Sequence, residues 1–401
     1  MPAHRPLTRA LSLTGSLVAL SIGLPMATAS TPAGASRPSE TASETASASS
    51  TVIPFTAADV TETTAGSYDI TWSAPSSAGT VRVYAGTNPL VDATTDEVGS
   101  GGHSATIVVR PPSTPAARWY FTLTPSKGEP LVVADRSLHM ADDPNLRDVG
   151  GYRTADGQWV RMGVLYRSGA LNNLSPAETQ ELSALGVTTV FDLRTDAERA
   201  ATTDRLPAGT DYVVANVLAG STNDANVTLA ASQLLDGPDK ASATVAQARG
   251  IMAGLYDQLP VLASADAAYR SLFTAAAGAS PTHAVLFHCT AGKDRTGWAT
   301  AALLLELGVP MASVEQDYLL SNQYVLPYYK SVVSSYVAQG GKASVVDAVL
   351  GVQPQYLEDS LAVMKSHYGS VQAYFSEGLG LTPNELAELR STLLEGTPQA
   401  R

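Results

Sequence analysis

The chain has 401 residues, of which 44% are hydrophobic and 15% charged, so it is neither disordered overall nor fibrous and can hold two domains with sizeable cores. Its formal net charge of −12 disfavours binding to nucleic acid and to anionic membrane surfaces, and an anionic ligand would need a local basic site. The chain has one cysteine, which excludes an intrachain disulfide.

The first 29 residues have the pattern of a secretory signal peptide. Arg5 and Arg9 precede an apolar run over 11–26, and the small residues Ala27-Thr28-Ala29 follow it. The alternative is a membrane anchor, but the run is short and interrupted by polar residues. The sequence therefore predicts cleavage after Ala29, a secreted, extracellular protein and no stable membrane anchor.

Residues 30–50 are rich in Ser, Thr, Ala and Pro and show no apolar period. Such a composition cannot bury a core, and it predicts a disordered linker.

The segment 51–139 has the pattern of a small all-β domain. Apolar and polar residues alternate over 68–72 and 119–123, and turn residues separate several such runs. We expect an immunoglobulin-like or fibronectin-III-like β-sandwich without a disulfide, acting as a spacer or a binding surface. Trp72 and Trp119 could bind carbohydrate, but tryptophans in a sandwich more often lie in the core.

From residue 140 to 401, strand-like runs alternate with helical ones. Capping boxes at 175–178 and 382–385 predict helix starts, and 187–191 reads as a buried strand. The alternation predicts an α/β domain with a mostly parallel central sheet flanked by helices. The stretch 218–247 is less regular and predicts an insertion or lid.

Ten residues of this domain carry the strongest chemical signal. An apolar strand at 284–287 comes before them and an apolar helix at 298–307 follows, so they join the carboxyl end of a strand to the amino end of a helix. Backbone amides of such a loop, with the positive helix end, form an anion cradle. The residues are His288-Cys289-Thr290-Ala291-Gly292-Lys293-Asp294-Arg295-Thr296-Gly297.

Each side chain of this loop has a chemical use. Cations and amides that bind phosphate also stabilise a thiolate, so Cys289 would be ionised and nucleophilic. Arg295 can hold two phosphate oxygens at once, and Lys293 adds a cation at the rim. Thr296 can stabilise the leaving thiolate, and His288 can fix the loop by hydrogen bonding. The alternative for Cys289 is a small buried hydrophobic residue.

The loop sequence HCTAGKDRTG resembles the Cys-x5-Arg protein tyrosine phosphatases, in particular their bacterial lipid-phosphatase-like branch. Further segments outside the loop are similar to motifs of the same family, and the sandwich lies outside the resemblance. These segments are 145–152, 165–170, 192–194, 317–322 and 368–370.

The resemblance implies hydrolysis of a phosphomonoester in two steps through a phosphocysteine, with no metal or other cofactor. Cys289 would attack, and Arg295 would hold the transferring group together with the loop. The substrate-binding residues implied in the loop are Thr290, Ala291, Gly292, Lys293 and Thr296.

A general acid must protonate the leaving oxygen, and the sequence offers two aspartates. Asp192 ends a predicted strand and is the preferred candidate, although it could instead pair with Arg194 or Arg199. Asp294 lies inside the loop, where it could instead cap the following helix. We expect Asp148 to orient a loop and to have a structural role.

The sequence thus predicts a secreted tyrosine or dual-specificity phosphatase that acts on a phosphorylated protein. A phosphoinositide or inositol-phosphate phosphatase is the alternative, because extra lysines such as Lys293 can meet additional phosphates. An alternative of another class is a non-catalytic anion-binding or adhesion protein, in which the loop is only a phosphate pocket.

Overall fold

The computed structural model describes residues 52–64, 66–89, 96–111, 116–221, 231, 234–235 and 240–399. The predicted signal peptide at 1–29 and linker at 30–50 lie outside this part of the chain, as does much of the predicted insertion at 218–247. Within the described part, no helix has both the length and the apolar character needed to cross a bilayer.

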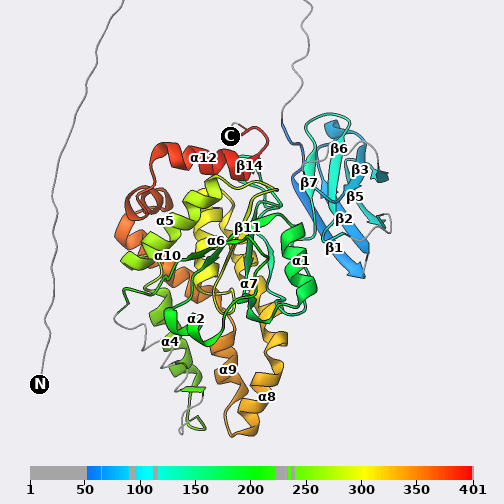
Figure 1. The fold of residues 1–401 in the computed structure, drawn as a ribbon. Helices are drawn as coiled ribbons and strands as arrows, with labels where there is room; N and C mark the ends of the chain where they lie inside the picture. Colours follow the sequence, from blue (N-terminus) through cyan, green and yellow to red (C-terminus); the bar gives the residue numbers. More distant parts are fainter. Residues whose placement is uncertain are drawn as a thin grey trace, which may run out of the picture. The chain divides into compact units, whose positions relative to one another are not determined.

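The first part of the structure, up to residue 133, consists of two antiparallel sheets (Figure 1). One sheet has the strand order β1-β2-β5 and the other the order β4-β3-β6-β7. The strands are β1 (Ala57–Thr64), β2 (Ser67–Ser73), β3 (Val81–Gly86), β4 (Glu97–Gly101), β5 (Ser104–Val109), β6 (Tyr120–Pro125) and β7 (Leu131–Val133).

An apolar core fills this part because alternate residues of each strand turn inward. Ile70, Trp72 and Phe121 are all buried in one cluster. The indole of Trp72 also donates a hydrogen bond of 2.9 Å to the carbonyl oxygen of Gly102. Trp72 is therefore a core residue, and its ring is not available to stack on a sugar. Trp159, which follows this part in sequence, packs into the same cluster.

The rest of the chain is an α/β structure, as predicted. Its main sheet has the order β12-β11-β13-β10-β8. Neighbours among the first four strands pair in parallel, whereas β8 pairs antiparallel to β10, so the sheet is mixed. The strands are β8 (Arg147–Asp148), β10 (Leu165–Ser168), β11 (Val187–Asp192), β12 (Asp211–Val214) and β13 (Ala284–His288), and a separate pair is β9 (Trp159–Val160) with β14 (Leu394–Glu395).

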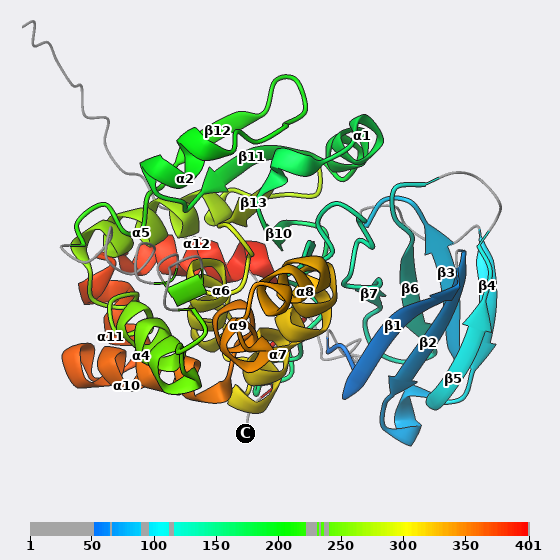
Figure 2. The same ribbon diagram turned by 90° about the horizontal axis from the view of Figure 1, so that it is seen from below.

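Helices surround this sheet, and Figures 1 and 2 show α4, α8 and α9 side by side. The α-helices are α1 (Pro176–Ala184), α2 (Asp196–Ala201), α4 (Val245–Tyr256), α5 (Ala263–Ala277), α6 (Arg295–Glu306), α7 (Met311–Tyr328), α8 (Lys330–Ala338), α9 (Ala343–Leu350), α10 (Pro354–Tyr368), α11 (Val371–Ala373) and α12 (Pro383–Leu393). Short elements are the 3-10 turns η1 (Ser76–Ala78) and η2 (Leu171–Asn173) and the π-turn η3 (Tyr374–Gly378).

Local sequence explains where several helices begin. Both predicted capping boxes are present, with Ser175 and Thr382 each accepting a hydrogen bond from the backbone amide three residues later. Two further boxes start α2 at Thr195 and α4 at Thr244. These caps satisfy amides that the first helical turn leaves without partners.

The centre of the main sheet positions the loop predicted to be functional. β13 lies between β11 and β10, and all five of its residues are buried. The chain leaves its carboxyl end at Cys289 and enters α6 at Arg295. The loop therefore lies where the positive end of α6 meets the carboxyl edge of the sheet, which is the usual ligand-binding edge of such folds.

Candidate active site

The loop is held in place by its carbonyl oxygens. The amide of Ala170 donates to Thr290 O at 3.0 Å, Asn145 Nδ2 donates to Ala291 O at 2.7 Å, and Arg167 donates to Gly292 O at 2.8 Å. Three successive carbonyls thus turn outward, away from the interior of the loop. This arrangement leaves the loop amides to face an anion.

Gly292 permits the turn that this arrangement needs. Its φ is 68°, in the left-handed region, and a Cβ there would lie 2.3 Å from the carbonyl oxygen of Ser168. No residue with a side chain fits this position without moving the neighbouring strand.

Cys289 lies buried at the base of the loop. Burial alone would raise the pKa of its thiol, but the charge of Arg295 and the proximity of Thr296 outweigh that effect and lower the pKa. The environment therefore favours the thiolate, which is the nucleophilic form.

Arg295 is paired with a carboxylate that the sequence analysis did not single out. Its two terminal nitrogens each lie 2.7 Å from an oxygen of Glu198, and Thr290 Oγ1 hydrogen bonds to the same carboxylate. Burial would raise the pKa of Glu198, but the hydrogen bonds and charge of Arg295 lower it to about 2. Glu198 also closes the capping box of Thr195, a sequence signal that places it at the start of α2 but does not predict its partner.

Asp294 is held by hydrogen bonds beside the loop. Tyr256 donates to its Oδ1 at 2.7 Å, and Lys293 Nζ lies 2.8 Å from both carboxylate oxygens. Tyr318 in turn donates to Tyr256 at 2.6 Å. Asp294 is the first residue before α6, but its side chain makes no capping hydrogen bond. The alternative that Asp294 caps the following helix is therefore wrong.

The expected position of Lys293 at the rim is wrong. Its side chain is only 4% exposed, because its ammonium group pairs with Asp294. It cannot meet an additional phosphate without breaking that pair.

Asp192 is not suited to donate a proton to a substrate. Its carboxylate is fully buried and forms a two-pronged ion pair with Arg194, with contacts of 2.6 to 3.0 Å, and it also accepts a hydrogen bond from Tyr212 at 2.5 Å. Burial would raise the pKa of Asp192, but Arg194, His288 and Tyr212 together lower it. The structural alternative, a pair with Arg194, describes this residue, and the preference for Asp192 as general acid is corrected.

His288 and Asp148 have supporting positions. The buried imidazole of His288 hydrogen bonds through Nδ1 to Cys289 O at 3.1 Å, as expected of a residue that fixes the loop. Asp148 accepts hydrogen bonds of 2.7 Å from the amides of Gly150 and Gly163. It therefore orders the backbone at these two glycines, and its hydrogen bonds do not reach the cysteine loop.

A second network of buried, charged side chains lies behind the loop, and the sequence analysis did not identify it as a unit. Asp317 lies 3.1 Å from Arg147 and 2.6 Å from Arg167, and the latter arginine holds Gly292. All three side chains are almost completely buried. The family-like motifs at these positions therefore serve to brace the loop.

In the described part of the chain, one group of side chains has the spacing of metal ligands. Asp192, Asp204 and His288 each offer an atom within 4.8 Å of the others. The guanidinium of Arg194 already bridges the two carboxylates, at 2.6 Å from each. Since this cation occupies the position that would suit a metal, we assign no metal to the group.

Comparison with known proteins agrees with the geometry. Residues 138–395 match the model of the tyrosine phosphatase family. The chain is 34% identical over 257 residues to a tyrosine-protein phosphatase homologue of Cupriavidus necator, covering 63% of this chain and 86% of that protein. It is 32% identical over 274 residues to the triple specificity protein phosphatase PtpB of Mycobacterium tuberculosis, covering 62% and 96%. The chain belongs to the tyrosine phosphatase family and is a phosphoric monoester hydrolase.

Proposed function

We propose that this enzyme removes phosphate from tyrosine residues of proteins, and from serine or threonine residues as well, through a phosphocysteine formed on Cys289. The observation that carries the proposal is the outward turn of three loop carbonyls around a buried cysteine whose neighbour is Arg295. The names of the relatives, a tyrosine-protein phosphatase and a triple specificity phosphatase, support the same substrate class.

In the first step, the Cys289 thiolate attacks phosphorus and the bond from phosphorus to the leaving oxygen breaks. The loop amides and Arg295 stabilise the charge on the transferring group. Asp294 donates its proton to the leaving oxygen. In the second step, water attacks the phosphocysteine, Asp294 takes a proton from that water, and inorganic phosphate leaves with the thiolate restored.

Two features support Asp294 as the acid in place of Asp192. It adjoins Arg295 in the loop, and its side chain is 15% exposed, whereas that of Asp192 is fully buried. Tyr256 and Lys293 fix its carboxyl group. A proton donor needs this combination of fixed position and access to the substrate.

The test is turnover of an aryl phosphate by the wild-type protein and by Cys289→Ser. We expect the substitution to abolish turnover, because a hydroxyl is not ionised at neutral pH, and we expect a chelator to leave the wild-type rate unchanged. Turnover retained by Cys289→Ser would refute the mechanism. Phosphate binding without any turnover by the wild type would instead favour the non-catalytic alternative.

We further propose that the protein is exported and that 1–29 is a cleaved signal peptide, followed by a linker at 30–50, an immunoglobulin-like or fibronectin-III-like module at 51–139 and the phosphatase domain at 140–401. The support is the sequence pattern and, for the module, its two antiparallel sheets. Amino-terminal sequencing of protein recovered from culture medium tests the cleavage after Ala29.

A further inference from the structure

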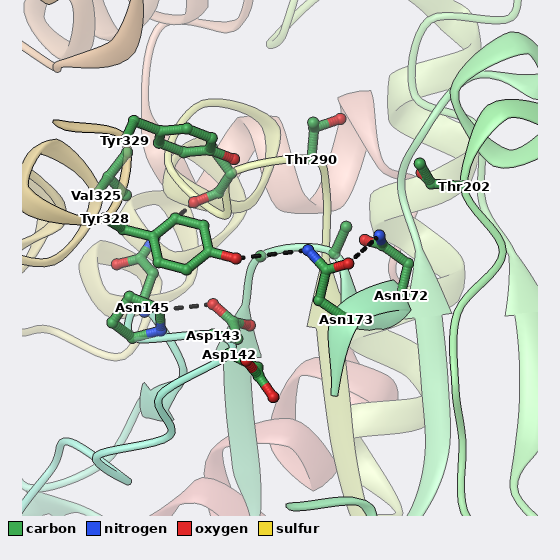
Figure 3. Close-up of a pocket in the computed structure, with 14 residues that line it drawn as sticks. Asp142, Asp143, Asn145, Asn172, Asn173, Thr202, Thr290, Val325, Tyr328 and Tyr329 are labelled. Atoms are coloured by element: carbon green, nitrogen blue, oxygen red, sulfur yellow. Dashed lines mark hydrogen bonds between the residues drawn. The ribbon is translucent and has the colours of Figure 1, made fainter. Parts of the chain in front are cut away.

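A cavity of about 210 Å³ lies beside the cysteine loop and is lined in part by Thr290 and Ala291. This volume is several times the roughly 30 Å³ that a water molecule occupies in the liquid. Figure 3 shows the residues that line it, with Tyr328 and Tyr329 on one side and Asn172 and Asn173 on the other. The mechanism above uses none of these four side chains.

The lining is rich in groups that accept hydrogen bonds. Asp142 and Asp143 contribute carboxylates, and the nearby asparagines and phenols contribute further oxygens. None of the described residues that line the cavity is a lysine, arginine or histidine. Such a lining repels a second phosphate and attracts a cation.

Among the lining residues, Asp143 has a buried side-chain oxygen whose hydrogen-bonding capacity is unused. The residue is 5% exposed, and its Oδ2 has no hydrogen-bond partner among the described residues. Its other oxygen accepts a hydrogen bond from the amide of Asn145 at 3.3 Å. Figure 3 shows the hydrogen bond between Asn145 and Asp143, and the separate one between Asn173 and Tyr328, among the residues that line the cavity. A buried carboxyl oxygen without a partner is costly, and a cationic donor supplied by a ligand would stabilise its ionised form.

The cavity adjoins the catalytic loop at Thr290, which lines it and follows Cys289 directly in the chain. Thr290 also hydrogen bonds to Glu198 and Arg295. Burial raises the pKa of the Tyr329 phenol to about 12, and the negative charges of Asp143 and Cys289 contribute to the rise. Tyr329 therefore lies within the fields of both groups. Because Thr290 lines the cavity and adjoins Cys289, the cavity is a candidate position for a side chain that flanks a phosphorylated residue bound at Cys289.

We propose that this cavity is a specificity subsite for the side chain of a lysine or arginine that flanks the phosphorylated residue of a protein substrate. An ammonium or guanidinium group would donate to Asp143 and lie against the tyrosine rings. The proposal rests on the proposed function and names its substrate class: basic phosphopeptides, as opposed to inositol rings with several phosphates. The net charge of −12 also favours basic substrates at longer range.

The test uses a series of phosphotyrosine peptides in which one position at a time is varied, from three residues before the phosphotyrosine to three residues after it. At each varied position, one peptide carries lysine, one alanine and one glutamate. Neighbouring side chains are about 3.3 Å apart along an extended peptide, so this scan spans the cavity. For the wild type we expect kcat/KM about tenfold higher for lysine than for alanine at one position, and lowest for glutamate there.

Asp143→Asn should reduce the preference to less than about threefold, because it replaces the unpaired carboxylate oxygen with a donor. Asn173→Lys, at an exposed position of the lining, should abolish it by placing a fixed cation at the cavity. Glu388→Gln removes one exposed negative charge from α12 and serves as the matched control, which should keep the preference. The kcat/KM of each variant for an aryl phosphate is measured as well. Dividing the peptide values by it corrects for any change in the activity of the cysteine loop itself.

Binding of the same peptides to Cys289→Ser, followed by fluorescence anisotropy, gives a measurement that does not require turnover. The lysine peptide should bind more tightly than the alanine peptide. Equal kcat/KM and equal binding at all positions, or a preference that survives both Asp143→Asn and Asn173→Lys, would overturn the subsite. A wild type that turns over no aryl phosphate would overturn the proposed function, while the binding measurement would still decide on the subsite.

Discussion

The carboxylate of Glu198 accepts a hydrogen bond of 2.7 Å from each terminal nitrogen of Arg295. The guanidinium group is therefore fixed by a residue at the start of helix α2, which is not the helix that carries Arg295. Breaking one partner of such a partly buried pair typically costs about 2–5 kcal/mol where the other charge stays behind.

We predict that Glu198→Gln lowers kcat/KM for an aryl phosphate by about tenfold to a hundredfold, because Arg295 loses its counter-charge and its fixed orientation. Steady-state kinetics measure the loss. Asp196→Asn, in the same helix with a side chain that is 84% exposed, is the control and should be close to wild type. An equal loss in both variants would show that helix α2, and not the ion pair, is responsible.

The two aspartates considered as general acid should respond differently to substitution. Asp294→Asn should lower kcat and remove the fall of the rate on the basic side of its pH profile, since that limb reports the acid. Asp192→Asn should leave the shape of the profile intact but lower the melting temperature, because Arg194 would lose one of its two buried counter-ions. A profile that changes shape only in Asp192→Asn would reverse the assignment.

Asp143 should make stability depend on pH. Burial raises the pKa of its carboxyl group from 3.8 to about 7, against the opposing charges of His288 and Arg147. The folded protein therefore holds a proton that the unfolded chain releases at lower pH, and this contribution to stability is lost as pH rises from about 4 through 7.

We accordingly expect Asp143→Asn to raise the melting temperature relative to wild type at pH 8 and to give a smaller gain at pH 5. Thermal unfolding at the two pH values measures the difference. An identical shift at both would mean that the carboxyl group is not the source of the pH dependence.

Arg118 and Asp148 form a buried ion pair of 2.6 Å that joins the segment before β6 to strand β8. Arg118→Met should destabilise the protein by about 3–5 kcal/mol, because Asp148 would remain buried without its cation. Denaturant unfolding measures this loss. Arg82→Met, which removes an exposed arginine from β3, should leave stability close to that of the wild type.

The functional loop could be predicted from sequence because its determinants are local. A strand, a glycine-bearing turn and a helix follow one another, and the chemistry of Cys289 and Arg295 depends on that order. The proton donor could not be predicted in the same way. Asp192 ends a strand and Asp294 lies in the loop after another, and only the fold shows that Asp192 forms a buried ion pair with Arg194.

Other parts of the site depend on contacts between distant segments. Glu198 is recognisable in sequence as a helix cap, but its pair with Arg295 spans 97 positions of the chain. The sequence predicts Lys293 as a second cation at the rim of the loop. Its neighbour Asp294 instead draws the ammonium group inward, and no pattern of residue types distinguishes the two outcomes.

The outward carbonyls of the loop have a consequence for how the enzyme uses binding energy. Asn145, Arg167 and Ala170 hold the backbone before any ligand arrives, so no free energy of association is spent on ordering it. A small tetrahedral oxyanion needs only to displace water from amides that already converge. Planar or bulky anions gain little from this rigidity, because a loop fixed from behind cannot widen to admit them.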